Sequence, residues 1–127
     1  MTTRLRKAAA MAAALVVTIV LAACSGPATP EGSPPADATH VTVSATEYSY
    51  EVSSKTLEAG WIVFDLTNNG RMQHNLVLEG GPGGGTDVID PGETDSLAVT
   101  LEPGTYTLFC SIPGHRAQGM EFKITVM

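Results

Sequence analysis

The chain has 127 residues and a mass of 13.2 kDa, which is enough for one domain and leaves little room for a large enzyme. The chain has 7 lysines and arginines and 13 aspartates and glutamates, which gives a formal charge of −6. This charge argues against non-specific binding to the phosphates of nucleic acids. Hydrophobic residues make up 43% of the chain, with 13 glycines and 8 prolines, a composition that fits a turn-rich β domain rather than a coiled coil.

The first 23 residues have the pattern of a signal peptide. Arg4, Arg6 and Lys7 precede an uncharged run of 16 residues at positions 8–23, whose bulky aliphatic residues lie in its second half. A transmembrane helix is the alternative, but the run is shorter than the roughly 20 apolar residues that a bilayer core requires. We therefore expect residues 1–23 to be removed.

The run ends in Leu21-Ala22-Ala23-Cys24, which resembles a bacterial lipobox. This resemblance implies cleavage before Cys24 and attachment of a diacylglycerol to its sulfur, which makes the product a lipoprotein. The alternative is the small-residue cleavage site of an ordinary secreted protein, which leaves Cys24 as a free thiol. Removal of residues 1–23 leaves 4 basic and 13 acidic residues, a net charge of −9.

Residues 24–39 are expected to form a disordered, Pro-rich linker that carries the lipid anchor. The segment 25–39 reads SGPATPEGSPPADAT, with four prolines, two glycines and no bulky side chain that could anchor a core. We assign it the role of a spacer. Residues 40–127 remain, enough for a small domain that folds on its own.

Apolar and polar residues alternate in several runs of this domain, with the period of half-buried strands. The pattern predicts strands at residues 40–46, 61–67, 97–101, 106–110 and 122–126. Turns rich in glycine, proline and asparagine separate them, and helical spacing is absent. Short strands joined by such turns predict an all-β sandwich or barrel.

One loop between the last two predicted strands concentrates soft metal ligands. Cys110, His115 and Met120 offer a thiol, an imidazole and a thioether within eleven residues. The Pro113-Gly114 pair and Gly119 allow the chain to turn twice, so the three side chains can point toward one place.

A fourth candidate ligand lies far upstream. His74 precedes an apolar run and is 36 residues before Cys110. Two histidines, one cysteine thiolate and a weak axial methionine form the ligand set of a blue-copper electron-transfer site.

The domain as a whole resembles the cupredoxins, the type 1 copper proteins of the plastocyanin and azurin superfamily. The resemblance rests on the His74-Asn75 pair, on the Pro-Gly-Thr-Tyr run at 103–106, and on the loop with Cys110, His115 and Met120. The Cys-to-His separation is similar to that of azurin and rusticyanin, the His-to-Met gap to that of rusticyanin, and Asn75 to azurin.

This resemblance implies a Greek-key β-sandwich that binds one type 1 copper ion. His74, Cys110 and His115 would be its equatorial ligands and Met120 its axial ligand. It also implies that the amide of Asn75 hydrogen-bonds the loop backbone near Cys110 and so holds strand and loop together.

Each candidate residue also has an ordinary explanation. Cys110 alone could be a small buried hydrophobe, His74 a surface polar group and Met120 a filler of the core. Asn75 could be a turn residue. A disulfide between Cys24 and Cys110 is a rival explanation for the two cysteines.

Other conspicuous residues are given no role in the site. His40 is expected to be exposed to solvent, and Met72 either borders the site or packs beneath it. The glycine-rich segment 80–85 lacks the lysine and the following helix of a phosphate-binding loop, so we expect a flexible loop there.

The resemblance implies an electron carrier that cycles between Cu(I) and Cu(II). Its lipid anchor would hold it on the extracytoplasmic or periplasmic face of the cell membrane. His115 should lie near the surface, with its ring edge reachable through the apolar residues Ile112, Pro113 and Gly114, and His74 should lie deeper. Redox proteins, basic ones included, are the expected partners, and nucleic acid is not.

Enzymes are largely excluded by what the chain lacks. A binuclear copper centre needs a second cysteine in the loop, and this loop has one. Multicopper oxidases need more His-x-His pairs than the three histidines of this chain can form. A nucleophilic pair of Cys110 and His115 would leave His74 and Met120 without a role. The open alternative is a copper-binding protein that stores or delivers the metal without relaying electrons.

Overall fold

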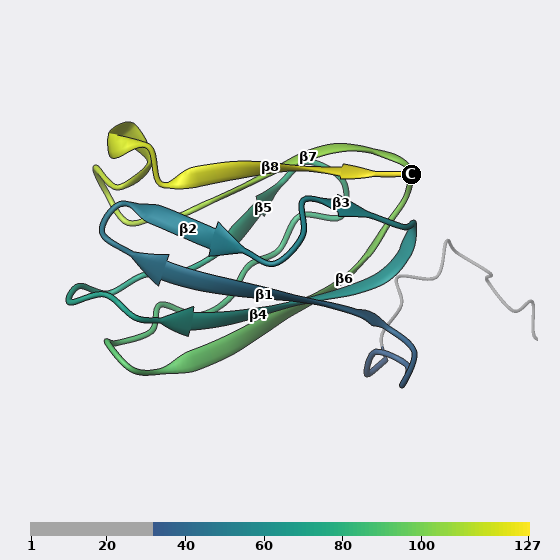
Figure 1. Cartoon of the computed structure of the whole chain (residues 1–127), viewed down its shortest axis with the longest axis horizontal. Coiled ribbons are helices and arrows are strands. Elements are labelled where there is room, and N and C mark those ends of the chain that lie inside the picture. The colour runs from purple at the N-terminus through teal and green to yellow at the C-terminus, as the bar shows by residue number, and fades with distance from the viewer. Residues whose placement is uncertain (1–31) are drawn as a thin grey trace, which may run out of the picture.

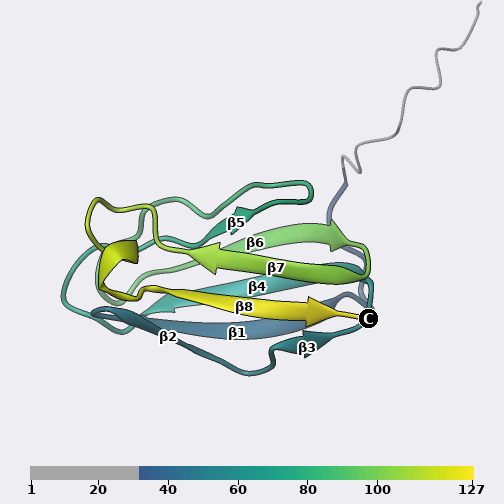
Figure 2. The same cartoon turned by 90° about the horizontal axis from the view of Figure 1, so that it is seen from above.

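The computed structural model describes residues 32–127, which form a sandwich of two β-sheets (Figure 1 and Figure 2). The expected signal peptide, Cys24 and the first part of the expected linker lie outside the described residues. In the part of the chain that is described, no helix is long and apolar enough to cross a membrane.

The first sheet has the strand order β2-β1-β4-β6. Strands β1 and β4 are parallel, whereas the β1–β2 and β4–β6 pairs are antiparallel. The bounds are β1 (Thr39–Thr46), β2 (Ser49–Val52), β4 (Gly60–Asn68) and β6 (Thr94–Leu101).

The second sheet has the order β3-β8-β7-β5 and is also mixed, because β3 runs parallel to β8. A short 3-10 helix, η1 (Arg116–Gln118), interrupts the connection from β7 to β8. The bounds are β3 (Thr56–Leu57), β5 (Val77–Glu79), β7 (Gly104–Phe109) and β8 (Glu121–Val126).

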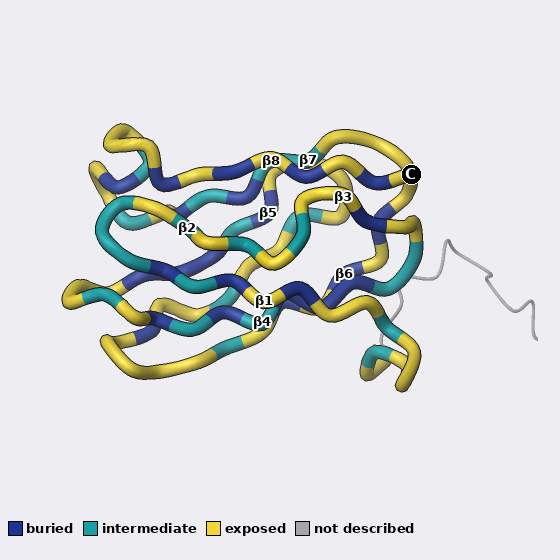
Figure 3. The backbone as a smooth tube through the Cα atoms, in the orientation of Figure 1, coloured by how far each residue is buried: buried dark blue, intermediate teal, exposed yellow. Residues whose placement is uncertain are grey.

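The core lies between the sheets and follows the alternation of the strands (Figure 3). Every second residue of β1, β6 and β8 is buried, and Phe64 in the middle of β4 is fully buried. Since side chains on a strand point alternately to its two faces, one face of each sheet supplies the core and the other meets solvent.

All five predicted strands are present, as β1, β4, β6, β7 and β8, and the all-β prediction is confirmed. Strands β2, β3 and β5 were not predicted. They have two to four residues each, too few for a periodic pattern. Strand β2 forms a hairpin with β1, whereas β3 and β5 are defined by pairing with strands far along the chain. Several boundaries differ from the predicted ones: β6 begins three residues earlier and β7 two residues earlier, and β7 ends at Phe109, which leaves Cys110 in the loop.

The two ends of the sandwich differ (Figure 1). The loop that contains η1 and the β1–β2 turn lie at one end, on the left of the figure. Residues 32–38 and the C-terminus lie at the other end. The chain therefore enters the sandwich at the end opposite the loop with the candidate ligands.

Replacing Phe64 with alanine tests the core. The Phe64 side chain is fully buried between the sheets, so we expect Phe64→Ala to lower the free energy of unfolding by about 3–5 kcal/mol. Urea unfolding of the metal-free protein measures the change. Val88, which is 49% exposed, supplies the control, since Val88→Ala should change stability by less than about 0.5 kcal/mol. Equal effects of the two substitutions would contradict this account of the core.

Candidate metal centre

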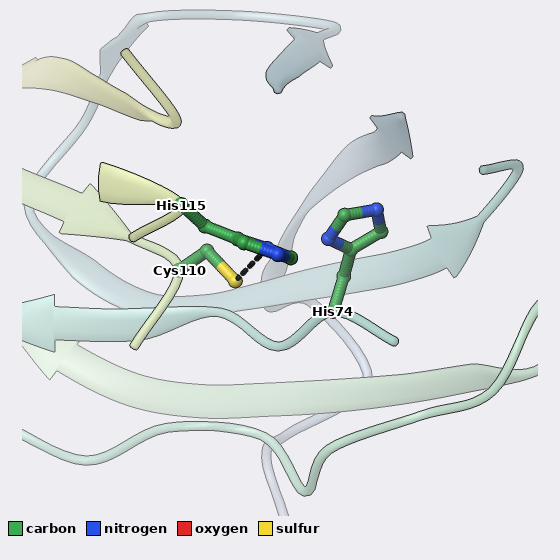
Figure 4. A group of neighbouring side chains, drawn as sticks. All are labelled: His74, Cys110 and His115. Atoms are coloured by element: carbon green, nitrogen blue, oxygen red, sulfur yellow. Dashed lines mark hydrogen bonds between the residues drawn. The ribbon is translucent and has the colours of Figure 1, made fainter. Parts of the chain in front are cut away.

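His74, Cys110 and His115 meet at the end of the sandwich that contains η1 (Figure 4). Each offers one potential ligand atom, these atoms lie within 4.8 Å of one another, and all three residues are buried. Among residues 32–127, no other group of three histidine, cysteine or acidic side chains has this arrangement. The fold thus joins residues that are 36 positions apart in the sequence.

The loop from β7 to β8 is closed by its own backbone. The Cys110 N–H donates to the Met120 carbonyl over 3.1 Å, and the Met120 N–H donates to the His115 carbonyl over 3.2 Å. Gly114 and Gly119 have φ values of 85° and 99°, which residues with a side chain rarely adopt. These turns bring the ends of the loop together, as the glycines in the sequence had suggested.

Met120 is fully buried and directly precedes the final strand, β8. Its backbone contacts with Cys110 and His115 fix the main chain of residue 120 beside the other candidate ligands. Its role as an axial ligand stays a prediction.

A two-residue bridge to Ile89 places the backbone of His74. The His74 N–H donates to the Ile89 carbonyl over 3.2 Å, and the Ile89 N–H donates to the His74 carbonyl over 2.9 Å. The buried Asn68, at the end of β4, donates to the carbonyls of Met72 and Ile89 and accepts from the Gly70 N–H. Asn68 therefore shapes the loop that carries His74, a role that sequence reasoning missed because Asn68-Asn69-Gly70 indicated only a turn.

Asn75 joins the His74 segment to the cysteine loop. Its Oδ1 accepts a 2.9 Å hydrogen bond from the Ser111 N–H, and its Nδ2 donates to Ser111 Oγ over 2.7 Å. The expected hydrogen bond to the loop backbone is thus present, directly after Cys110. The Tyr50 hydroxyl donates to the Asn75 carbonyl, so β2 supports the same junction.

The two imidazoles have different surroundings. His74 Nε2 lies 3.1 Å from a carboxylate oxygen of Glu47, whereas His74 Nδ1 is buried without a hydrogen-bond partner in residues 32–127. His115 Nδ1 lies 3.5 Å from Cys110 Sγ, and the Tyr48 ring packs edge-on against the His115 ring at 5.2 Å between centroids.

Burial and hydrogen bonding shift the pKa values of three groups at the site, and burial acts most strongly on His115 and Tyr50. It lowers the pKa of His115, with a smaller contribution from His74, and so favours the neutral imidazole that binds metal ions. Burial, followed by electrostatic interaction with Cys110, raises the pKa of Tyr50, which therefore stays a neutral donor. The backbone N–H groups of Met72 and Arg71 lower the pKa of Glu47 to about 2, so its carboxylate is ionised.

His115 is less open than the sequence suggested. It is only 3% exposed and His74 is 0% exposed, so both rings are buried. Pro113 and Gly114, which directly precede His115 in the loop, are exposed, and Ile112 is half-buried.

Arg116 ties the loop to its surroundings from the outside. Its guanidinium binds Glu79 through two nitrogens, binds Glu121 through Nε, and lies 4.1 Å above the Phe109 ring. Because the fork of an arginine is planar, this set of contacts fixes the backbone next to His115 as well as the side chain.

The remaining predictions have mixed outcomes. The His40 side chain is 61% exposed and bonded to Asp65, as expected for a surface residue. Met72 is 44% exposed and accepts a weak bond from the Tyr48 hydroxyl, so it lies at the border of the site. Cys110 forms no disulfide within residues 32–127, and Cys24 lies outside them.

The donor set fits copper. A thiolate and two imidazoles suit both Cu(I) and Cu(II), and Nδ1 of His74 is a buried nitrogen without a hydrogen-bond partner in residues 32–127, which a metal ion could satisfy. Fold and donor set together define a β-sandwich metalloprotein with a soft, buried copper site.

The chain belongs to the cupredoxin-like domain family, whose sequence model matches residues 11–126. Cupredoxins bind one copper ion, and in this chain His74, Cys110 and His115 form the group that could hold it. A search of curated protein sequences finds no match to this chain.

Among solved structures, auracyanin B is 26% identical with a TM-score of 0.65, over 76% of this chain and 92% of auracyanin B. Rusticyanin from Thiobacillus ferrooxidans is 25% identical with a TM-score of 0.59, over 69% of this chain and 76% of rusticyanin. Auracyanin A of Chloroflexus aurantiacus, described as a "blue" copper protein, is 22% identical with a TM-score of 0.58, over 69% of this chain and 99% of auracyanin A. The first two similarities support the family, and the third shows the fold.

Removing the Asn75 side chain tests the junction. Asn75→Ala leaves the Ser111 N–H without its acceptor, so we expect a loss of about 1–3 kcal/mol in the free energy of unfolding, measured in urea without metal. Asn69 supplies the control, because it is exposed and, among the described residues, its side chain bonds Ser44 alone. An Asn75→Ala effect no larger than that of Asn69→Ala would contradict the role of the junction.

Proposed function

We propose that this protein is a type 1 copper electron carrier, with His74, Cys110 and His115 as equatorial ligands and Met120 as the axial ligand. The observation that carries the proposal is the convergence of three buried donors within 4.8 Å at one end of a cupredoxin sandwich. The copper supplies one-electron chemistry between Cu(I) and Cu(II) when it is bound.

The role of the protein is to keep the positions of the ligand side chains fixed when the oxidation state changes. Copper(II) and copper(I) prefer different surroundings, and a fixed set of imidazole, thiolate and thioether donors is acceptable to both. The backbone bonds between Cys110, His115 and Met120 and the Asn75–Ser111 junction limit rearrangement of the loop. Burial of the donors keeps water away from them.

Retention of the metal favours a carrier over a delivery protein. A delivery protein should present its ligands to a partner, whereas His74 and Cys110 are both 0% exposed. We likewise infer a carrier rather than an enzyme, in keeping with the cupredoxin family.

We propose that electrons enter and leave past His115. The surface in front of it, Ile112, Pro113 and Gly114, offers a small apolar contact to a redox partner. The acidic remainder of the protein would attract a basic partner, with an association rate that falls as salt rises.

The location follows from the proposed anchor. A diacylglycerol on Cys24 would hold the protein on the outer side of the cell membrane. Residues 32–38 enter the sandwich at the end opposite the candidate ligands (Figure 1), which supports an orientation with the copper end turned away from the anchor.

Replacing Cys110 with serine tests the proposed ligand set. The oxidised, copper-loaded protein should be intensely blue because of the copper–thiolate bond, and Cys110→Ser should lose that colour. Optical absorption of both proteins after loading with one equivalent of Cu(II) measures it. A colourless wild type, or a serine variant that keeps the band, would contradict the proposal.

Replacing His115 with glycine tests the electron route. The variant should keep a ligand-accessible copper but exchange electrons more slowly, by about tenfold or more, since even indirect changes around metal ligands have effects of this size. Self-exchange measured by NMR line broadening gives the rate, and added imidazole should restore part of it. Unchanged exchange would count against this route, and transfer of Cu(I) to a chelating partner faster than self-exchange would favour delivery.

A further inference from the structure

Glu47 contacts the candidate metal centre from the opposite sheet. It lies in the turn between β1 and β2, whereas the cysteine loop joins β7 and β8. Its Oε1 lies 3.1 Å from Nε2 of His74. The ligand set proposed above does not use this carboxylate, and the sequence pattern did not single it out.

The backbone holds the Glu47 carboxylate in place. The N–H groups of Arg71 and Met72 both donate to the same Oε1, each over 2.7 Å. Gly70 makes room for this arrangement, because a Cβ at residue 70 would lie 2.9 Å from His74 Nε2 and would clash with Glu47 Oε1. The position of the oxygen beside the ring is therefore determined by the main chain and does not depend on His74 itself.

This contact decides which nitrogen of His74 carries the proton. Oε1 already accepts from two backbone N–H groups, so it is an acceptor toward the ring as well and Nε2 is the donor. The lone pair of the neutral ring is then on Nδ1. Nδ1 is buried and has no hydrogen-bond partner in residues 32–127. Figure 4 shows that the ring nitrogen next to the side-chain attachment faces Cys110 and His115.

We propose that Glu47 is a positioning residue of the copper site, which holds His74 in the Nε2–H form and directs the Nδ1 lone pair at the metal. This inference rests on the proposed function insofar as His74 binds copper. A histidine that donates to a carboxylate is also a more basic ligand. Because Cu(II) gains more than Cu(I) from a basic nitrogen ligand, Glu47 favours the oxidised state.

In the described residues, Glu47 makes a direct contact with only one of the two imidazoles. His115 has its Nδ1 near Cys110 and its ring against Tyr48, and no carboxylate bonds to it in the described residues. Substitution of Glu47 therefore changes His74 while the cysteine loop keeps its own contacts.

Two substitutions separate orientation from charge. Glu47→Gln keeps an oxygen for the N–H groups of Arg71 and Met72, so the loop should fold and His74 should stay in the Nε2–H form without the adjacent charge. Glu47→Ala removes the acceptor as well. The matched control is Glu51→Gln, which removes the same charge from an exposed position on β2.

The first measurement needs no metal. Nitrogen-15 NMR of the metal-free protein at neutral pH should show the proton of His74 on Nε2 in wild type and in Glu47→Gln, and a mixture of the two forms in Glu47→Ala. A wild-type His74 with its proton on Nδ1 would overturn the proposal. If wild type binds no copper, the proposed function fails, and this measurement still decides the positioning role.

The second measurement uses copper. Competition with chelators should show a loss of Cu(II) affinity of about 10–100-fold for Glu47→Ala. Glu47→Gln should keep the blue band but lose more affinity for Cu(II) than for Cu(I), which raises the reduction potential, whereas Glu51→Gln should match wild type. Equal ratios of Cu(II) to Cu(I) affinity in Glu47→Gln and Glu51→Gln would overturn the proposal.

Discussion

The burial of several metal-binding side chains against one another is the constraint on which this structure depends. A buried polar atom without a partner costs about 1–3 kcal/mol, and Nδ1 of His74 has none in the part of the chain that the structure describes. Two imidazoles and a thiol would not gather in an apolar core for stability alone, since His74, Cys110 and His115 displace hydrophobic contacts there. A metal ion supplies the missing partner, and the arrangement of the surrounding loops follows from the need to keep its ligands in place.

In the sandwich, the buried polar side chains of the candidate metal centre are separate from the apolar core that stabilises the fold. The apolar core runs along β1, β4, β6 and β8, and each of these strands forms a continuous ladder of backbone pairs with a neighbouring strand. The candidate ligands lie in the loops at one end, where backbone hydrogen bonds within the loops and turns at glycines hold the chain in place of strand pairing. A rigid body with the site at one end and the incoming chain at the other is a suitable scaffold for contact with a partner.

A ring of polar side chains connects the loops at that end. Asn68 shapes the loop before His74, Asn75 binds the segment after Cys110, and Glu47 reaches His74 from the first sheet. Each of them bonds backbone groups from a segment distant in sequence, so the site is cross-linked by hydrogen bonds in addition to the covalent chain. Such outer contacts orient metal ligands and tune their basicity.

The sequence by itself determined the all-β class, five of the strands and the residues of the candidate site, because alternation of apolar residues and the ligand chemistry of cysteine and histidine are local properties. It also contained the turns that close the Cys110 loop. Strands β2, β3 and β5, the position of Glu47 and the burial of His115 were decided only by the tertiary structure. Strand β2 is a local hairpin partner of β1 that is too short for a periodic pattern. The other features depend on pairing and packing between segments far apart in the chain, and no local pattern of side chains records which distant segment will lie beside them.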